Sequence, residues 1–463
     1  MSSDFRIEKD SLGEKKVPRE AYYGIQTARA IENFPISGLR PHQALVEATV
    51  LIKLAAAKAN MFVADLDNNK GEAIIKAAWE VMEGKFQDQF VVDPFQAGAG
   101  TSHNMNANEV LANRAIEILG GEKGNYGLVH PNDHVNMGQS TNDVFPTAMR
   151  LSTLVLLKKF YPVAEELIKT FRQKGLEFDS ILKSGRTHLQ DAVPIRLGQE
   201  FEAYAKALSD DLERIGQSSE NLKILGIGGN AVGTGLNTKP GFRKKLVQEL
   251  ASLTGMELKS SVNLIEATQN LNPLAAVSSS LKLFALSLIR IANDVRLLSS
   301  GPKTGLGEII LPAVQPGSSM MPGKVNPVMA EVLDMVAFQV VGNDLTVAMA
   351  TQAGQFELNV MMPVIIHNIL QSLDILTHVC EAFTQKCLSG IQADPERCWK
   401  YVEESMGIAT ALNPYLGYEV AAKLVQESLA TKIPVKQLVL SKGLLSPQMV
   451  EQVFSLEKMT EAP

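Results

Sequence analysis

The hydrophobic residues in the central part of the chain repeat at helical spacing over unusually long stretches. Between residues 273 and 300 the apolar positions step by three and four and form one stripe, made of Leu274, Val277, Leu281, Phe284, Leu288, Ile291 and Val295. Comparable patterns predict helices over 43–63, 147–175, 197–223, 328–353 and 361–388. Several of these exceed the length of an ordinary globular helix, which is about 8–20 residues.

Some of these predicted helices are apolar on more than one face, as in the segment LKLFALSLIRIA over residues 281–292. Contact with a single neighbour would leave the other apolar faces in water. We therefore expect a mainly α-helical fold with a long central bundle that other subunits complete.

The composition and the hydrophobic spacing divide the chain into three regions. Residues 1–140 are mixed and rich in Asn and Gly, residues 141–395 hold the long helical patterns, and residues 396–463 form a smaller helical piece. We find no internal repeat and no low-complexity linker. The prediction is an N-terminal mixed domain, a central bundle domain and a small C-terminal helical domain.

The composition is that of a globular protein, with 463 residues of which 45% are hydrophobic and 20% are charged. The net charge of −6 and the pI near 5.8 argue against broad nucleic-acid binding. The first residues are charged and lack an apolar core, so we expect no secretory signal. No run of about eighteen apolar residues occurs, so we expect no membrane span. The three cysteines, Cys380, Cys387 and Cys398, lack disulfide or zinc spacing and are expected to be reduced, packed thiols of a cytoplasmic protein.

Polar, hydrogen-bonding residues crowd into four segments near predicted helix ends: 98–109, 132–143, 185–191 and 317–327. The last, GSSMMPGKVNP, offers two hydroxyls, one cation and one amide in a loop that could close over a small anion. Hydroxyls and free N–H groups at helix N-termini also suit an anion. Each segment has a structural alternative, because these are ordinary loop and capping residues and a lone histidine is often structural.

Two other kinds of site are not predicted. The histidines form no HExxH motif, which argues against a catalytic metal. Residues 226–231 read GIGGNA and fit the GxGxxA dinucleotide fingerprint, but no βαβ pattern surrounds them. We expect neither a nucleotide cofactor nor a metal.

The four segments, in this order, resemble the active-site segments of the aspartase/fumarase superfamily. GSSMMPGKVNP is similar to the superfamily signature GSSxMPxKxN, and the likeness runs from RIEKDSLGEKKVPREAYYGIQT near the start into the C-terminal tail. The resemblance implies a mainly helical, three-domain subunit and a homotetramer with a central helical bundle. It also implies active sites assembled from segments of three subunits.

Within this superfamily, GAGTS at 98–102, QSTND at 139–143 and ELNVM at 357–361 resemble the ammonia-lyase branch, whereas class II fumarases typically read GSGTQ and QSSND. Met320, Ala330 and Met362 depart from the usual Ile, Pro and Glu, and leave the presumed catalytic side chains intact. The implied reaction is the reversible deamination of L-aspartate to fumarate and ammonia. The alternatives are fumarate hydratase activity on malate and a catalytically inactive structural homologue of the lens-crystallin type.

The resemblance also implies a role for each site residue. The general base is Ser318; the β-carboxylate is bound by Thr101, Ser140, Thr141 and Ser319; the α-carboxylate is bound by Thr187, Lys324 and Asn326; and the amino group faces Asn142 and His188, with Glu331 orienting His188. This chemistry requires no organic cofactor and no metal. The expected partners are a small dicarboxylate and copies of the chain itself, without nucleic acid or membrane.

Overall fold

The computed structural model describes residues 4–460, and it is mainly helical. Two compact units make up the chain, and each is discontinuous in sequence. Unit 1 comprises residues 1–160, 213–283 and 339–376, and unit 2 comprises residues 161–212, 284–338 and 377–463. The predicted boundaries near 140 and 395 fall at the starts of two helices. The three-domain division itself stays a prediction.

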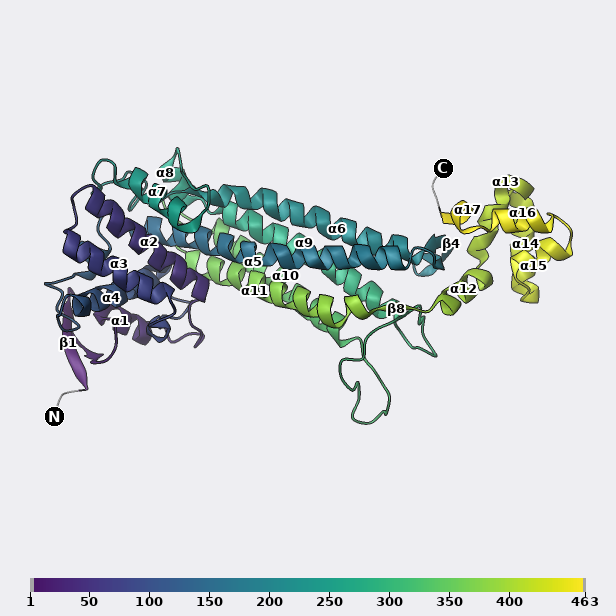
Figure 1. Cartoon of the computed structure of the whole chain (residues 1–463), viewed down its shortest axis with the longest axis horizontal. Coiled ribbons are helices and arrows are strands. Elements are labelled where there is room, and N and C mark those ends of the chain that lie inside the picture. Colours follow the sequence, from purple (N-terminus) through teal and green to yellow (C-terminus); the bar gives the residue numbers. More distant parts are fainter. Residues whose placement is uncertain (1–3, 461–463) are drawn as a thin grey trace. The chain divides into compact units, whose positions relative to one another are not determined.

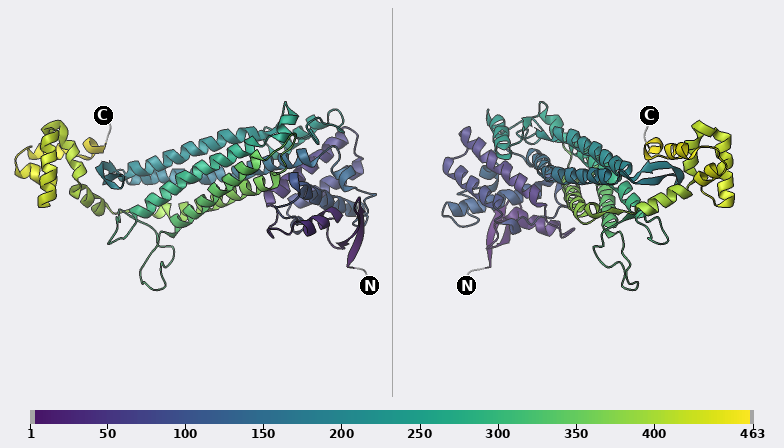
Figure 2. Two further views of the ribbon diagram at one scale, coloured as in Figure 1. Left: turned by 180° about the vertical axis from the view of Figure 1, so that it is seen from behind. Right: turned by 45° about the vertical axis from the view of Figure 1, so that its right-hand side comes forward.

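Long helices contribute one segment to each unit and lie side by side within it (Figures 1 and 2). They are α5 (Thr141–Glu177), α6 (Leu197–Ser219), α9 (Asn272–Leu298), α10 (Val328–Gln352) and α11 (Met362–Lys386). Their bounds confirm the helices predicted from hydrophobic spacing. Every residue of the predicted stripe on α9, from Leu274 to Val295, is 0% exposed, so the spacing marked the buried face correctly.

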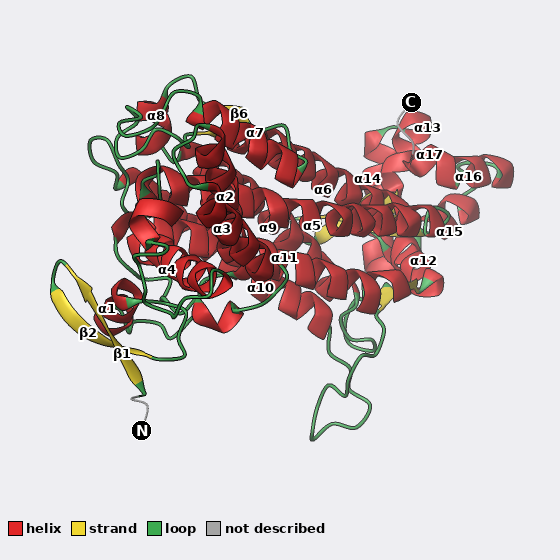
Figure 3. Cartoon of the chain, turned by 60° about the vertical axis from the view of Figure 1, so that its left-hand side comes forward, coloured by secondary structure: helices red, strands yellow, loops and turns green. Residues whose placement is uncertain are grey.

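Unit 1 also holds the N-terminal helices, which pack around an apolar core (Figure 3). Its further elements are β1 (Phe5–Asp10), β2 (Gly13–Pro18), α1 (Ile25–Asn33), α2 (Gln43–Phe62), α3 (Asn68–Met82), α4 (Thr101–Ile118), β5 (Ile224–Leu225), α7 (Phe242–Thr254), β6 (Lys259–Ser260) and α8 (Leu264–Gln269). The first turn of α1 has no cap from its own N-cap residue, Gly24. The buried carboxylate of Glu109 on α4 instead accepts the backbone N–H groups of Gly24, Gln26 and Thr27.

Unit 2 contains a β-hairpin and the small C-terminal helices, which share a second core. Its further elements are β3 (Leu182–Thr187), β4 (Gln190–Arg196), β7 (Ile309–Ile310), β8 (Gln392–Ala393), α12 (Pro395–Glu404), α13 (Asn413–Leu416), α14 (Tyr418–Thr431), α15 (Val435–Ser441), α16 (Pro447–Val453) and α17 (Leu456–Thr460). Strands β3 and β4 are antiparallel, as are β7 and β8. Between β7 and α10, residues 311–327 leave the helices as an open loop (Figure 2).

Charged side chains tie α9 to α10. Lys282 Nζ lies 2.5 Å from Asp344 Oδ2 in unit 1, and Arg296 Nη1 lies 3.1 Å from Asp334 Oδ2 in unit 2. By length and composition alone, both helices are also apolar enough to cross a membrane. Core helices of a bundle have the same composition, and the cross-helix ion pairs join these two as neighbours in one bundle.

The cysteines are free and buried, as the sequence predicts. Burial raises the pKa of each thiol to about 12. At neutral pH they are therefore protonated packing groups.

Candidate active site

The predicted site residues fall into two groups, one in each unit. Unit 1 holds Thr101, Ser140, Thr141 and Asn142, and unit 2 holds Thr187, His188, Ser318, Ser319, Lys324, Asn326 and Glu331. Each group is described in turn.

Thr101 begins α4, directly after a turn that glycine makes possible. Ala99 and Gly100 both have positive φ, at 60° and 80°, and a Cβ atom at Gly100 would collide with the ring of Phe145. The Ala99 N–H donates to the carbonyl of Val360, 2.9 Å away. This turn leaves Thr101 exposed on the first turn of α4, where its hydroxyl can reach a ligand.

Ser140 caps α5 through a reciprocal pair of hydrogen bonds. Its Oγ accepts the Asn142 N–H at 3.2 Å, while Asp143 Oδ1 accepts the Ser140 N–H at 3.0 Å. The capping interpretation therefore holds for Ser140. Thr141 and Asn142 are not used as caps, and their half-buried side chains make other contacts.

Asp143 also binds the turn whose sequence resembled a dinucleotide fingerprint. Its Oδ2 accepts the N–H groups of Gly228 at 3.0 Å and Asn230 at 2.8 Å. Burial raises the pKa of Asp143 to about 6, against the lowering effect of these backbone donors and of Lys53. No helix opens after the turn, because α7 begins only at Phe242. In this fold the GIGGNA segment anchors the start of α5.

Asn142 is oriented by the same turn. Its Nδ2 donates to the carbonyl of Ala231 at 2.8 Å. Because that contact engages the amide nitrogen, Oδ1 is left as the group that can accept a hydrogen bond from a ligand. This orientation suits an ammonium donor.

A buried polar network lies behind Thr141, and the sequence reasoning missed it. Asn104 Nδ2 donates to Thr141 Oγ1 at 3.0 Å and to Asn136 Oδ1 at 3.3 Å, and Asn136 Oδ1 also accepts from Lys53 Nζ at 2.8 Å. Lys53 is 0% exposed. The available signal was a single charge in the apolar run VLIKLAAA over residues 50–57.

His103 borders this network as a neutral histidine. Thr49 Oγ1 donates to the Leu45 carbonyl at 2.8 Å, so its contact of 2.9 Å with His103 Nε2 requires the ring proton on Nε2. Burial, with the charge of Lys53 as a second cause, lowers the pKa of His103 to about 4.

In unit 2, Thr187 and His188 lie at the tip of the β3–β4 hairpin. Thr187 pairs with Gln190, so His188 and Leu189 form a two-residue turn, and both have positive φ, at 54° and 58°. Such a turn has φ > 0 at both central residues and usually contains Asn and Gly. A leucine in this conformation is strained, which is characteristic of functional sites. The turn exposes both Thr187 and His188.

A buried ion cluster holds the base of this hairpin. Glu308 is 0% exposed, and its carboxylate accepts a two-pronged contact from Arg186, at 2.8 and 3.0 Å. Lys183 Nζ lies 3.2 Å from the same carboxylate. Glu308 directly precedes β7, so the cluster joins the hairpin to the base of the open loop.

Ser318 lies in that loop with its hydroxyl oxygen facing backbone donors. Its Oγ accepts the N–H of Met320 at 3.1 Å and that of Met321 at 3.0 Å. These two donors favour negative charge on the oxygen.

The neck of the loop is closed by contacts across its two arms. Gly317 N–H donates to the Lys324 carbonyl and Asn326 Nδ2 donates to the Gly317 carbonyl, both at 2.8 Å. Ser319 and Lys324 are exposed, while Glu331 lies in the first turn of α10. Within residues 4–460 no hydrogen bond joins His188 to Glu331, so the orienting role of Glu331 stays a prediction.

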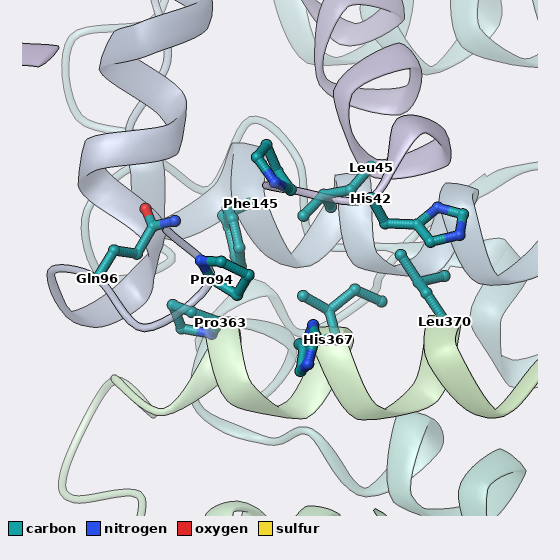
Figure 4. Close-up of a pocket in the computed structure, with 10 residues that line it drawn as sticks. His42, Leu45, Pro94, Gln96, Phe145, Pro363, His367 and Leu370 are labelled. Atoms are coloured by element: carbon teal, nitrogen blue, oxygen red, sulfur yellow. The ribbon is translucent and has the colours of Figure 1, made fainter. Parts of the chain in front are cut away.

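Two other histidines make their contacts within the protein. His130 and His134 stand four residues apart, but His134 Nδ1 accepts the His130 N–H at 2.7 Å, and its Nε2 lies 3.1 Å from Lys70 Nζ. The part of the chain that the structure describes has no cluster of three or more metal-binding side chains. A cavity of about 20 Å³ beside His42 and His367, shown in Figure 4, is nearly as small as one water molecule and contains none of the predicted site residues.

Comparison with known proteins agrees with the resemblance. The lyase family matches residues 13–342, and the fumarase C C-terminus family matches residues 408–461. An aspartate ammonia-lyase from Bacillus sp is 53% identical over 460 residues, which cover 99% of this chain and 98% of the relative. The structure of a fumarate lyase:delta crystallin from Brucella melitensis bound to cobalt aligns with a TM-score of 0.95 at 47% identity, over 98% of this chain and 99% of that one. A class II fumarase from Schistosoma mansoni aligns with a TM-score of 0.93 at 38% identity, over 98% and 99%. The chain is therefore a member of the lyase family of the aspartase/fumarase superfamily.

Proposed function

We propose that this chain is an aspartate ammonia-lyase, a carbon–nitrogen lyase that converts L-aspartate reversibly to fumarate and ammonia. The observation that carries this function is the 53% identity to a curated aspartate ammonia-lyase across 99% of the chain. The motifs GAGTS and QSTND, which begin α4 and α5, support the same branch.

The difficult step of this reaction is the removal of a weakly acidic Cβ proton beside a carboxylate that is already negative. The resulting charge is tolerable only if it spreads into that carboxylate as a dianionic enediolate. Preorganised donors stabilise such charge, at about 2.7–4 kcal/mol each in well-studied oxyanion sites. We assign this task to the hydroxyls of Thr101, Ser140, Thr141 and Ser319. Because these donors gain most in the dianion, they raise kcat more than they strengthen substrate binding.

Ser318 is the proposed general base. Its alkoxide takes the Cβ proton, and the C–N bond then breaks as the electron pair of the enediolate forms the double bond of fumarate. The N–H groups of Met320 and Met321, 3.1 and 3.0 Å from Ser318 Oγ, support this role because they stabilise the alkoxide. Closure of the loop over the substrate excludes water and strengthens these contacts.

The remaining residues position the substrate. Thr187, Lys324 and Asn326 bind the α-carboxylate, and Lys324 supplies a charge-assisted contact of roughly 1.5–3 kcal/mol. Asn142 and His188 face the departing amino group. The Asn142 amide supports this assignment because its nitrogen is held by Ala231 and its oxygen remains as an acceptor.

The active form in this proposal is a cytoplasmic homotetramer that shares its active sites among three subunits, and its chemistry uses no organic cofactor. One observation supports self-association. Apolar side chains are exposed along one face of α10, including Met335 at 65%, Phe338 at 57% and Leu345 at 65%.

The test is a pair of ultraviolet assays for fumarate formation, one from L-aspartate and one from L-malate. Turnover of aspartate alone establishes the ammonia-lyase. Turnover of malate alone assigns the chain to the fumarase branch, in which the aligned Schistosoma mansoni enzyme is 38% identical. Loss of both activities in a correctly assembled protein would favour an inactive structural homologue.

A further inference from the structure

Lys53 on α2 is a buried cation without a carboxylate in hydrogen-bond contact. Its side chain is 0% exposed, and Nζ donates to Asn136 Oδ1 at 2.8 Å and to Gln139 Oε1 at 3.1 Å. Burial of a charge whose close partners are neutral costs several kcal/mol. A methionine or leucine would fill this position at a lower free-energy cost, so packing alone does not account for the lysine.

The contacts of Lys53 determine how the neighbouring amides are turned. An ammonium group can only donate, so Asn136 must present its carbonyl oxygen to Lys53. Asn136 Oδ1 then accepts from Asn104 Nδ2 at 3.3 Å, and the same nitrogen donates to Thr141 Oγ1 at 3.0 Å. Because Thr141 Oγ1 accepts this bond, its own hydroxyl proton is free to point toward a ligand.

The orientation of the Asn104 amide leaves a buried acceptor without a hydrogen bond, so another contact must hold the amide in place. Asn104 is 1% exposed, and within residues 4–460 no donor reaches its Oδ1. An unpartnered buried acceptor costs about 1–3 kcal/mol. If the Asn104 amide were reversed, its Oδ1 could accept a hydrogen bond from the Thr141 hydroxyl. The same reversal would place Asn104 Oδ1 opposite Asn136 Oδ1, and two acceptors cannot form a hydrogen bond. The chain of contacts from Lys53 therefore holds Asn104 in the less satisfied orientation.

We propose that Lys53 is a positioning residue for the lyase reaction, which acts through Asn136 and Asn104 to keep the Thr141 hydroxyl proton directed at the substrate carboxylate. The inference rests on the proposed function in so far as Thr141 binds that carboxylate. All of the contacts lie within unit 1. Without Lys53 the amides of Asn136 and Asn104 can reverse. The Thr141 hydroxyl then donates its hydrogen bond to Asn104 instead of to the enediolate.

The positive charge of Lys53 also favours the enediolate. Burial lowers the pKa of Lys53 to about 7, and the nearby Asp143 carboxylate opposes that change. His103 is the second titratable group that interacts with Lys53, and it is neutral at pH 7 because its pKa is lowered to about 4. In its protonated form Lys53 is a cation near the start of α5, and that charge favours added negative charge on a carboxylate bound by Thr141.

The test compares Lys53→Met with the matched variant Lys174→Met. Lys174 is also buried, at 8% exposed, and its Nζ contacts the Ile391 carbonyl and Glu177, neither of which is a proposed site residue. We expect Lys53→Met to lower kcat roughly 10- to 100-fold, somewhat less than removal of an oxyanion donor itself, with a small change in KM. Lys174→Met should keep kcat near the wild-type value.

A double-mutant cycle with Thr141→Val identifies the route of the effect. If Lys53 acts through Thr141, Lys53→Met should lower kcat by less than about threefold in the Thr141→Val background. An equal loss in both backgrounds, or wild-type kcat in Lys53→Met, would overturn the proposal. Should Lys53→Met fail to assemble, Asn104→Leu cuts the same chain of contacts with the lysine in place, and it should show the same dependence on Thr141.

The double-mutant cycle can be interpreted whichever of the two substrates the protein accepts, so its failure is distinguishable from failure of the proposed function. The wild-type protein is first assayed with L-aspartate and with L-malate, and the cycle is run on the substrate that reacts. Both substrates carry the carboxylate that Thr141 would bind. A malate-specific enzyme would therefore contradict the ammonia-lyase function and leave the Lys53 cycle fully informative.

Discussion

At the residue scale, the proposed function depends most on the Ser318 hydroxyl. An ordinary serine is far too weak a base to remove a Cβ proton. Here two backbone N–H groups converge on its oxygen, and the neck of the loop is held by contacts between Gly317, Lys324 and Asn326. In the proposed function, these backbone groups take part in the activation that a neighbouring side chain supplies in other enzymes.

Replacement of Ser318 by alanine should lower kcat roughly 100- to 10,000-fold, the range of a lost general base, with KM near the wild-type value. The measurement is steady-state fumarate formation from L-aspartate. Ser318 lies in an open loop, so the thermal midpoint should hardly change. Near-wild-type turnover in this variant would refute the base assignment.

His103 gives the protein a pH-dependent stability at the residue scale. Its pKa is lowered from 6.5 to about 4, so between these values the unfolded chain binds a proton that the folded chain does not. The contribution of the neutral His103 ring to the free energy of unfolding is fully present above pH 6.5, and it is lost as the pH falls toward 4. Relative to His103→Gln, the wild-type protein should lose about 2 kcal/mol more between pH 7 and pH 5. Urea unfolding at the two pH values measures this difference, and parallel losses in both proteins would disprove it.

At the scale of elements, the β3–β4 hairpin depends on a buried ion cluster. Lys183 and Arg186 both lie on β3, and both contact the carboxylate of Glu308 beside β7. Arg186 also lies over the ring of Tyr401 on α12, 5.5 Å from its centre. One carboxylate thus joins the strand that ends at Thr187 to the start of the loop that carries Ser318.

Glu308→Gln should destabilise the protein by about 3 kcal/mol, because it leaves the partly buried Arg186 without its carboxylate and the buried Lys183 with Glu200 alone. It should also raise KM for aspartate, since the hairpin tip carrying Thr187 and His188 loosens. Chemical denaturation and steady-state kinetics measure the two effects. As the matched control, Lys206→Ala removes an exposed pair with Asp210 and should cost less than about 0.5 kcal/mol. Equal stability losses in the two variants would contradict the role of the cluster.

At the scale of the whole molecule, α10 has two apolar faces. Leu333, Ala337, Val340 and Val347 are buried on one side, while Met335, Phe338, Leu345 and Met349 are exposed on another. The exposed residues are spaced by three, seven and four positions, so they form one stripe along the helix. A stripe of this kind is an expected contact surface between subunits.

Phe338→Asp should dissociate the proposed tetramer, because it places a charge in the middle of this stripe. Light scattering should then report a smaller particle, and activity should fall with assembly if sites are shared. Val262→Asp alters a fully exposed apolar residue outside the stripe and should leave the tetramer intact. A tetrameric Phe338→Asp variant would argue that subunits meet elsewhere.

Sharing of the sites is testable by mixing two inactive variants, Ser318→Ala and Thr141→Val, after reversible dissociation. If the two residues of one site come from different subunits, random hybrids should regain about a quarter of the wild-type sites. Activity that stays at the level of the separate variants would indicate that each site takes both residues from one chain.

The sequence by itself determined the long helices and the buried stripe of α9, because a side chain's position around a helix follows from its spacing alone. Motif resemblance likewise indicated the branch of the superfamily, and it is the source of the proposed site hydroxyls. It could not indicate that Ser140 caps α5 while Thr141 does not, since both are good capping types.

Only the tertiary structure decided the groups that support those residues. Lys53, Asn104, Asn136 and Thr141 come from separate segments, and no local pattern states that they meet. The same holds for Glu308 with Arg186, which are 122 residues apart. Hydrophobic spacing reports which face of a helix is buried, but hydrogen-bond partners and charge burial depend on distances between segments that only the packed chain sets.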